Sequence, residues 1–141
     1  MIVRFIVENL FSFGERREFN LLPSPRHSRL SHHKYSLSNF DFLKLSVVYG
    51  ANGSGKSNLI KSISYLTNLV LEEEIPSRLQ QHKFKFHDDI KNVEVLLGVE
   101  FISEGIPFIY AVKFNEGIII HEELLISGMG KNDDILIFER K

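Results

Sequence analysis

The eight residues from Gly50 to Ser57 constrain this chain more than any others. They read Gly-Ala-Asn-Gly-Ser-Gly-Lys-Ser, a complete phosphate-binding loop, or P-loop. Its glycines accept positive φ angles and carry no Cβ, so successive backbone N–H groups can turn inward around an anion. A helix that begins at the loop adds unpaired N–H groups and the positive end of its dipole. The motif therefore predicts a strand, an anion-binding turn and a helix, in that order.

The residues on either side of the loop agree with this order. An apolar run rich in β-branched and aromatic residues predicts a buried strand over 43–49. After the loop, apolar residues recur at helical spacing from Leu59 to Val70, which predicts a helix ending at Glu74, ahead of Pro76. The alternative is a glycine-rich turn that contains lysine and serine by chance. Strand, glycines, Lys-Ser and helix would then all have to coincide.

The motif also assigns chemistry to particular residues. Lys56 can reach the β- and γ-phosphates of a nucleoside triphosphate, where it would stabilise transition-state charge. Ser57 can offer its hydroxyl to Mg²⁺ and is the expected metal ligand. No other catalytic residue is assigned. The residues expected to bind the nucleotide are Gly50, Ala51, Asn52, Gly53, Ser54, Gly55, Lys56, Ser57 and Asn58.

Composition restricts the class of protein. The 141 residues suffice for one domain, and 43% hydrophobic with 25% charged residues is an ordinary globular composition. A net charge of −1 predicts no general attraction to nucleic acid. The absence of cysteine excludes disulfides and thiolate metal sites. No run is long and apolar enough to span a bilayer and no signal peptide is recognisable, so no membrane partner and a cytoplasmic location are expected.

Hydrophobic periodicity predicts β-structure on both sides of the P-loop and its helix. An opening hairpin comes first, and 23–39 is expected to be a long surface loop. A short helix is predicted near 77–82. An antiparallel meander is expected within 93–140, because alternating apolar runs are joined by turns with no crossover helix between them. The expected strands are 2–7, 17–22, 93–101, 106–114, 118–126 and 135–138.

Four segments resemble a known group of proteins. Residues 50–59, Gly-Ala-Asn-Gly-Ser-Gly-Lys-Ser-Asn-Leu, are similar to the G-x-N-G-x-G-K-S-N-L of ABC-type ATPases of the SMC/RecF/OLD group. Residues 7–13, Val-Glu-Asn-Leu-Phe-Ser-Phe, resemble that group's opening strand followed by N-F-x-S-F. Residues 120–124 and 136–140 resemble strands of the AAA-family ATPases found in bacterial anti-phage operons. The resemblance covers most of the chain.

The resemblance implies a fold, a cofactor and partners. The implied fold is an α/β P-loop NTPase, the N-terminal lobe of an ABC-type ATPase, over residues 1–141. ATP with Mg²⁺ and a head-to-tail homodimer that sandwiches two nucleotides are also implied. The base is expected to lie against the edge formed by 11–16. A place in antiviral defence, a nuclease or other effector partner, and contact with nucleic acid are expectations by analogy.

Two motifs that hydrolysis needs in this group are not found. The runs 118–123 and 135–139 end in glutamate without an aspartate for the metal, so they are interpreted as strands with an acid on the wet face. The segment 126–131, Ile-Ser-Gly-Met-Gly-Lys, is similar to a signature loop but leads toward a strand, which favours a hairpin loop. The chain is therefore expected to be an N-terminal fragment that binds ATP better than it hydrolyses it.

Two other functions stay open. One is a nucleotide-binding scaffold or interaction module that does not hydrolyse ATP. The other is a P-loop kinase, which would need a lid and an acceptor site that the meander leaves little room for. An ATPase measurement on the complete gene product separates an enzyme from a scaffold.

Basic and aromatic residues outside the P-loop have simpler interpretations. The locally basic region 16–35 is either a contact for nucleic-acid phosphates or a partner subunit, or a solvated loop. The pairs His32–His33 and His82–His87 have no third ligand at a suitable spacing, so no metal is expected there. The alternation in 83–86 favours a half-buried strand with Lys83 on its wet face over a base-stacking platform.

Overall fold

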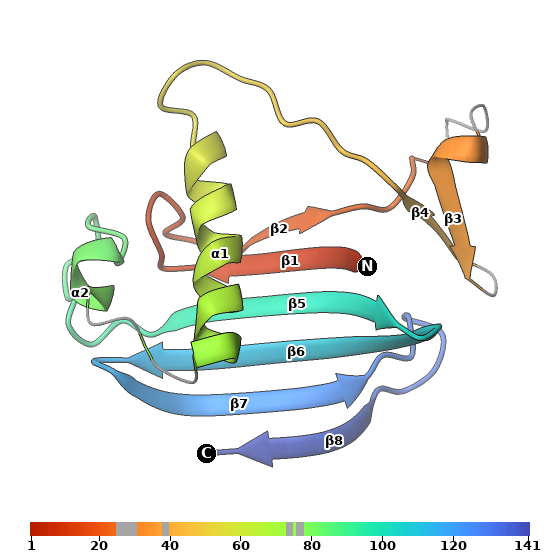
Figure 1. Ribbon diagram of the computed structural model, residues 1–141. Helices are drawn as coiled ribbons and strands as arrows, with labels where there is room; N and C mark the ends of the chain where they lie inside the picture. Colours follow the sequence, from red (N-terminus) through yellow and green to blue (C-terminus); the bar gives the residue numbers. More distant parts are fainter. Residues whose placement is uncertain (25–30, 38–39, 73–74, 76–77) are drawn as a thin grey trace.

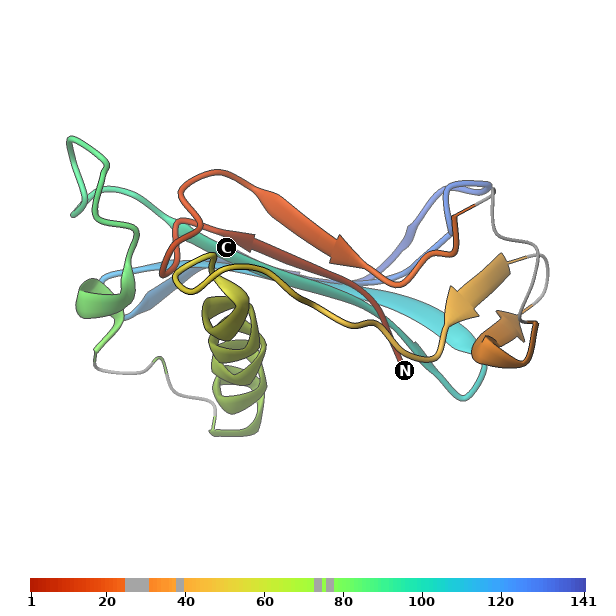
Figure 2. The same cartoon turned by 90° about the horizontal axis from the view of Figure 1, so that it is seen from above.

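The computed structural model describes residues 1–24, 31–37, 40–72, 75 and 78–141 (Figure 1). A six-stranded sheet has the order β2-β1-β5-β6-β7-β8, and every neighbouring pair in it is antiparallel. Helix α1 (Lys56–Glu72) crosses one face of this sheet, as Figures 1 and 2 show from two directions. The strands are β1 (Ile2–Glu8), β2 (Arg17–Asn20), β5 (Val95–Ser103), β6 (Ile106–Asn115), β7 (Ile118–Ile126) and β8 (Ile135–Arg140).

The opening hairpin and the meander confirm the sequence prediction. Strand β1 alternates buried and partly exposed residues, and its Phe5 lies opposite Phe19 of β2. The β5–β6 and β6–β7 turns, at 104–105 and 116–117, each have positive φ at both residues, which a two-residue type I′ hairpin turn requires. The antiparallel sheet combined with one long helix makes this an α/β structure.

The main core lies between α1 and the sheet. Tyr65, Leu66 and Leu69 of α1 are buried against Phe5 and Phe114, among other side chains of β1, β5 and β6. The rings of Tyr65 and Phe114 are stacked, with centroids 6.1 Å apart and planes within 4°. This packing anchors the helix that begins at Lys56, within the P-loop, so the core determines where that loop is held.

The segment 23–39 contains more structure than a surface loop. A 3-10 turn, η1 (Ser31–His33), leads into β3 (Lys34–Leu37), which pairs with β4 (Phe40–Leu43). The prediction of a loop is therefore wrong over 34–37. Phe42 of β4 is fully buried in a second small core, and this tertiary packing overrides the turn-rich composition. The rest of the expected loop lies partly outside the described residues.

The buried strand expected over 43–49 is not formed. Only Leu43 belongs to a strand, and the extended residues that follow have no strand partner among the described residues. Val47 is 74% and Tyr49 is 90% exposed. Within the six-stranded sheet β1 already pairs with β2 and β5, and the run 43–49 adds to neither outer edge, that of β2 or that of β8. An apolar run indicates that a segment is suited to burial, but burial also requires neighbouring strands or helices from other parts of the sequence.

Residues 83–86 also differ from the prediction, because they form no strand and Lys83 is only 1% exposed. Its ammonium group donates to the carbonyls of Ile90 and Lys91, at 3.1 Å each, and to the side chain of Asn115. These neutral acceptors satisfy a buried cation and close the loop that follows it. The exposed ring in this segment is that of Phe86, at 88%.

The helix predictions are confirmed within the described residues. Helix α1 ends at Glu72, and the expected end at Glu74 lies outside the described residues. The short helix near 77–82 is confirmed as α2 (Leu79–His82). Among the described residues, no helix is both long and apolar enough to cross a membrane.

His82 makes the stability of the fold depend on pH. Its ring lies 5.1 Å from the ring of Phe11, and its Nδ1 is buried without a hydrogen-bond partner. Burial lowers the pKa of His82, and the positive charges of Arg78 and Lys61 lower it further. The folded chain therefore takes up this proton less readily than the unfolded chain, and stability falls as the pH drops through the ordinary histidine pKa of 6.5.

We expect His82→Gln to lose less stability than the wild type between pH 7.5 and pH 5.5, one unit on either side of that value. Urea unfolding at the two pH values measures this difference. Other groups titrate equally in both proteins, so the comparison isolates His82. Identical losses in the two proteins would contradict the assignment.

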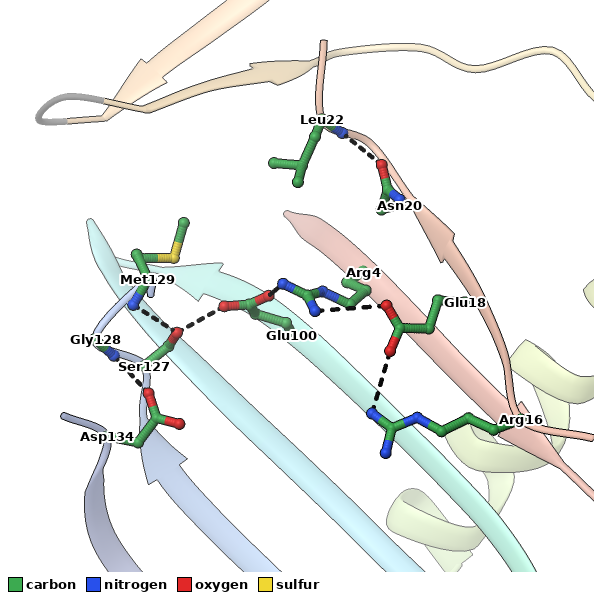
Figure 3. Close-up of polar contacts among 10 residues, drawn as sticks. All are labelled: Arg4, Arg16, Glu18, Asn20, Leu22, Glu100, Ser127, Gly128, Met129 and Asp134. Carbon is green, nitrogen blue, oxygen red and sulfur yellow. Dashed lines mark hydrogen bonds and ion pairs between the residues drawn. The ribbon is translucent and has the colours of Figure 1, made fainter. Parts of the chain in front are cut away.

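A polar network lies on the sheet face opposite α1 (Figure 3). Glu100, only 5% exposed, accepts a hydrogen bond from Ser127 Oγ at 2.6 Å and pairs with Arg4 at 3.1 Å. Arg4 also lies 3.5 Å from Glu18, which pairs with Arg16 at 3.2 Å. The network ties the end of β7 to β5, β1 and β2.

The same contacts shape the loop between β7 and β8. The backbone N–H of Gly128 donates to Asp134 at 2.8 Å, and that of Met129 donates to Ser127 Oγ at 3.1 Å (Figure 3). The loop leads into β8 and no helix begins in it. The interpretation of 126–131 as a hairpin loop is therefore confirmed.

Candidate functional site: the P-loop and its cleft

The P-loop runs directly into α1, which begins at Lys56, so the last two residues of the loop form the first two of the helix. Gly53 and Gly55 have φ angles of 81° and 92°, a region that residues with a Cβ rarely adopt. A Cβ on Gly55 would lie 3.2 Å from Ser12 Oγ, so the opening hairpin packs closely against the loop. The predicted turn and helix are confirmed, although the strand expected before them is not formed.

Lys56 spans the P-loop. Its Nζ donates to the carbonyls of Gly50 and Ala51, at 2.7 Å each, and lies 3.5 Å from Ser54 Oγ. None of the ion pairs among the described residues involves Lys56. Its positive charge therefore meets only neutral acceptors and is free to attract an anion at the helix N-terminus.

A cleft of about 660 Å³ opens beside the loop, a volume suited to a small-molecule ligand. Its lining combines the P-loop with the opening hairpin. Apolar walls and two cationic side chains therefore face the same space. The residues that line it are Val7, Ser12, Phe13, Arg17, Glu18, Phe19, Val48, Tyr49, Gly50, Gly53, Ser54, Gly55, Lys56 and Leu59.

The residues 11–16, expected to contact the base, do not all lie at the cleft. Ser12 and Phe13 line the cleft. Phe11 instead packs in the core beside Tyr65, with ring centroids 6.4 Å apart. Arg16 is held by Glu18 on the opposite face of the sheet (Figure 3).

Arg17 and Phe19 line the cleft, although the sequence predicted neither as a nucleotide-binding residue and placed Arg17 only in the locally basic region 16–35. Both belong to β2, and the hairpin register places Arg17 opposite Val7, which also lines the cleft. The predicted opening hairpin was the signal that could have identified them. The turn of the hairpin packs against the P-loop, so the strand that pairs with β1 lies beside the P-loop as well.

The residues of the P-loop cleft are suited to binding phosphates, and they supply part of the ligand set that Mg²⁺ needs. Ser57 is exposed at the second position of α1 and offers one hydroxyl ligand. Glu18 is the carboxylate residue lining the cleft, and its two oxygens are engaged by Arg4 and Arg16. One protein ligand is compatible with Mg²⁺, which keeps several waters and takes phosphate oxygens in nucleotide sites.

A second hollow, of about 630 Å³, lies between the C-terminal part of α1 and the strands β5 to β8. Its lining is mostly apolar, and its cation Arg140 is paired with Glu122 at 2.6 Å. It therefore lacks the free positive charge and the helix N-terminus found at the P-loop. The chemistry favours the P-loop cleft as the functional site.

Comparison with known families now adds an independent finding. Residues 45–141 match the model of a family described as "AAA domain, putative AbiEii toxin, Type IV TA system". The match includes the exposed apolar segment, the P-loop, α1 and the whole meander. No curated protein matches the sequence significantly.

Proposed function

The chain belongs to the AAA-domain family that its residues 45–141 match, and from this premise we propose that it binds ATP with Mg²⁺ in the P-loop cleft. A domain of this family is of the P-loop ATPase type. The observation that carries the proposal is the convergence of three anion-binding features at one cleft: the positive-φ glycines, the N-terminus of α1 and the free charge of Lys56.

Each part of the nucleotide has a place in this proposal. The β- and γ-phosphates lie against the backbone N–H groups of 53–57, with Lys56 donating to them instead of to the loop carbonyls. Ser57 would hold Mg²⁺ through its hydroxyl, and the bound ion would supply positive charge that offsets the charge of the phosphates. The base and ribose lie toward Phe13 and Phe19, because those rings supply the apolar wall of the cleft.

Hydrolysis requires more than the cleft provides. We propose that the chain is the N-terminal lobe of an ABC/SMC-like ATPase, in which a metal-binding aspartate, a water-orienting glutamate and a signature loop come from additional sequence. The segment 45–49 supports this. Its large apolar side chains are exposed here, whereas such a run is typical of a strand that neighbouring strands and helices bury on both faces. Additional sequence would supply those neighbours. By analogy with that group, we also propose a head-to-tail dimer, a nuclease or other effector partner, and a role in defence.

A non-hydrolysing nucleotide-binding module is the second candidate. It is favoured by the state of Glu18, since among the described cleft residues this carboxylate is already paired with two arginines. A paired carboxylate is a poor base for orienting a water molecule. Phosphate-release measurements with ATP and Mg²⁺ separate the two candidates, and turnover by the 141-residue chain would exclude the second.

Calorimetric titration of the chain with ATP and with AMP, each with Mg²⁺, tests nucleotide binding. We expect AMP to bind at least about tenfold more weakly, because it lacks the two phosphates that charge-assisted hydrogen bonds would hold. Chelating Mg²⁺ should also weaken ATP binding. Equal affinities for ATP and AMP would contradict a site built around the P-loop.

A further inference from the structure

A group of metal-ligating side chains lies at the far edge of the sheet, outside the P-loop cleft. His121 and Glu123 belong to β7, and Glu139 belongs to β8. Alternate residues of these strands, such as Glu122 and Arg140, line the hollow beneath α1. Successive side chains of a strand point to opposite faces, so His121, Glu123 and Glu139 lie on the face away from α1.

We propose that His121, Glu123 and Glu139 bind a divalent transition-metal ion, with Zn²⁺ as the representative. Their ligand atoms all lie within 4.8 Å of one another, and His121 Nε2 is 2.9 Å from a Glu139 oxygen. The ligands of a tetrahedral zinc ion lie about 3.4 Å apart, given bonds of about 2.1 Å. Small side-chain rotations therefore bring all three ligands around one ion.

The strand register creates a local excess of negative charge. Glu123 lies directly opposite Glu139 in the β7–β8 pair. Like charges in such positions destabilise a sheet unless something compensates them. Lys141 and His121 both contact Glu139, at 2.9 Å each, whereas none of the ion pairs among the described residues involves Glu123. A cation between the two carboxylates neutralises both.

The ligand set favours a transition metal over Mg²⁺. Imidazole nitrogen with two carboxylates suits Zn²⁺, whereas Mg²⁺ prefers oxygen ligands and retains its waters. Three protein ligands leave further positions on the ion to water. Lys113 on the neighbouring strand β6 is a cation that could compete with the metal ion for the carboxylates. It lies opposite His121 in the β6–β7 register, and its side chain is exposed.

A metal ion at this site would also stabilise the edge strand β8. Among the strands that the structure describes, β8 pairs with β7 alone, and all six of its residues are exposed. An ion held by His121 and Glu123 on one strand and by Glu139 on the other crosslinks them. Sequence patterns indicate an acid on the wet face of each strand, but only the register brings the acids and the histidine together.

Zinc binding by the nucleotide-free, full-length chain tests the proposal. Equilibrium dialysis with ZnCl₂ should show one more bound ion in the wild type than in His121→Ala, and at least about tenfold weaker binding at this site in Glu123→Gln. The matched controls His33→Ala and Glu94→Gln alter an imidazole and a carboxylate outside the group and should retain the ion. Equal zinc stoichiometry and affinity in wild type and His121→Ala would overturn the proposal.

Amide hydrogen exchange gives a second readout that locates the ion. Zinc should slow exchange in β8 of the wild type and leave β8 of His121→Ala unchanged, with the fold of each variant checked by circular dichroism. Zinc bound at the distant His32–His33 pair would not protect β8 in this selective way. Equal protection of β8 in both proteins, or none in the wild type, contradicts a metal bridge between the strands.

Discussion

Lys56→Ala is expected to weaken ATP–Mg²⁺ binding by roughly 10- to 150-fold, the equivalent of one charge-assisted hydrogen bond of about 1.5–3 kcal/mol. The ammonium group of Lys56 sits at the start of α1 without a carboxylate partner among the described residues. Alanine removes that charge while leaving the glycines and the helix in place. Calorimetric titration with ATP and Mg²⁺ measures the change.

Lys61→Ala is the matched control for this prediction. Lys61 is an exposed lysine of the same helix, one turn further from the loop, so its removal changes net charge by the same amount. It should leave ATP affinity within about twofold, because an exposed charge at that distance is screened by solvent. An unchanged affinity in Lys56→Ala, or an equal loss in both variants, would remove the basis for the P-loop as the nucleotide site.

Arg4→Met should lower the free energy of unfolding by roughly 1–3 kcal/mol, the range for leaving one buried group without its partner, because the Arg4 side chain itself is partly exposed. Arg4 is the cation that pairs with Glu100, whose side chain is only 6% exposed. Methionine keeps much of the side-chain length but leaves Glu100 with the hydroxyl of Ser127 as its hydrogen-bond donor. Urea unfolding followed by circular dichroism measures the loss.

Two further variants determine whether the buried charge is the cause. Arg16→Met breaks only the exposed pair with Glu18 and should cost less than about 1 kcal/mol. The double variant Arg4→Met/Glu100→Leu should recover most of the stability, because an apolar pair leaves no uncompensated charge. If the double variant were as unstable as Arg4→Met, the loss would come from packing rather than from the charge of Glu100.

The sequence contains enough local information for the hairpin, the meander and the start of α1. Alternation of apolar residues and turn residues such as Gly105 and Gly117 act over a few positions, so their effect does not depend on the rest of the fold. The P-loop is predictable for the same reason. Its glycines, Lys56 and the helix that follows are contiguous, and the chemistry of the loop is a property of that stretch alone.

The parts that could not be predicted depend on distant neighbours. The run 45–49 reads as a buried strand, but burial requires flanking strands that the described residues do not supply. Phe42 is buried through contacts with Val3 and Ile102, far away in sequence. The burial of Lys83 likewise depends on carbonyls of a later loop. The cleft wall formed by Arg17 follows only once the packing of the hairpin on the P-loop is known.

The contacts of Lys56 with Gly50 and Ala51 have a consequence for nucleotide recognition. A lysine side chain that moves freely in solvent loses about 2 kcal/mol of conformational freedom when a ligand immobilises it. Here the ammonium group is already fixed across the loop by two carbonyls at 2.7 Å. Binding of a phosphate then exchanges one set of acceptors for another, and little further entropy is lost. The loop is preorganised for its anion by its own lysine.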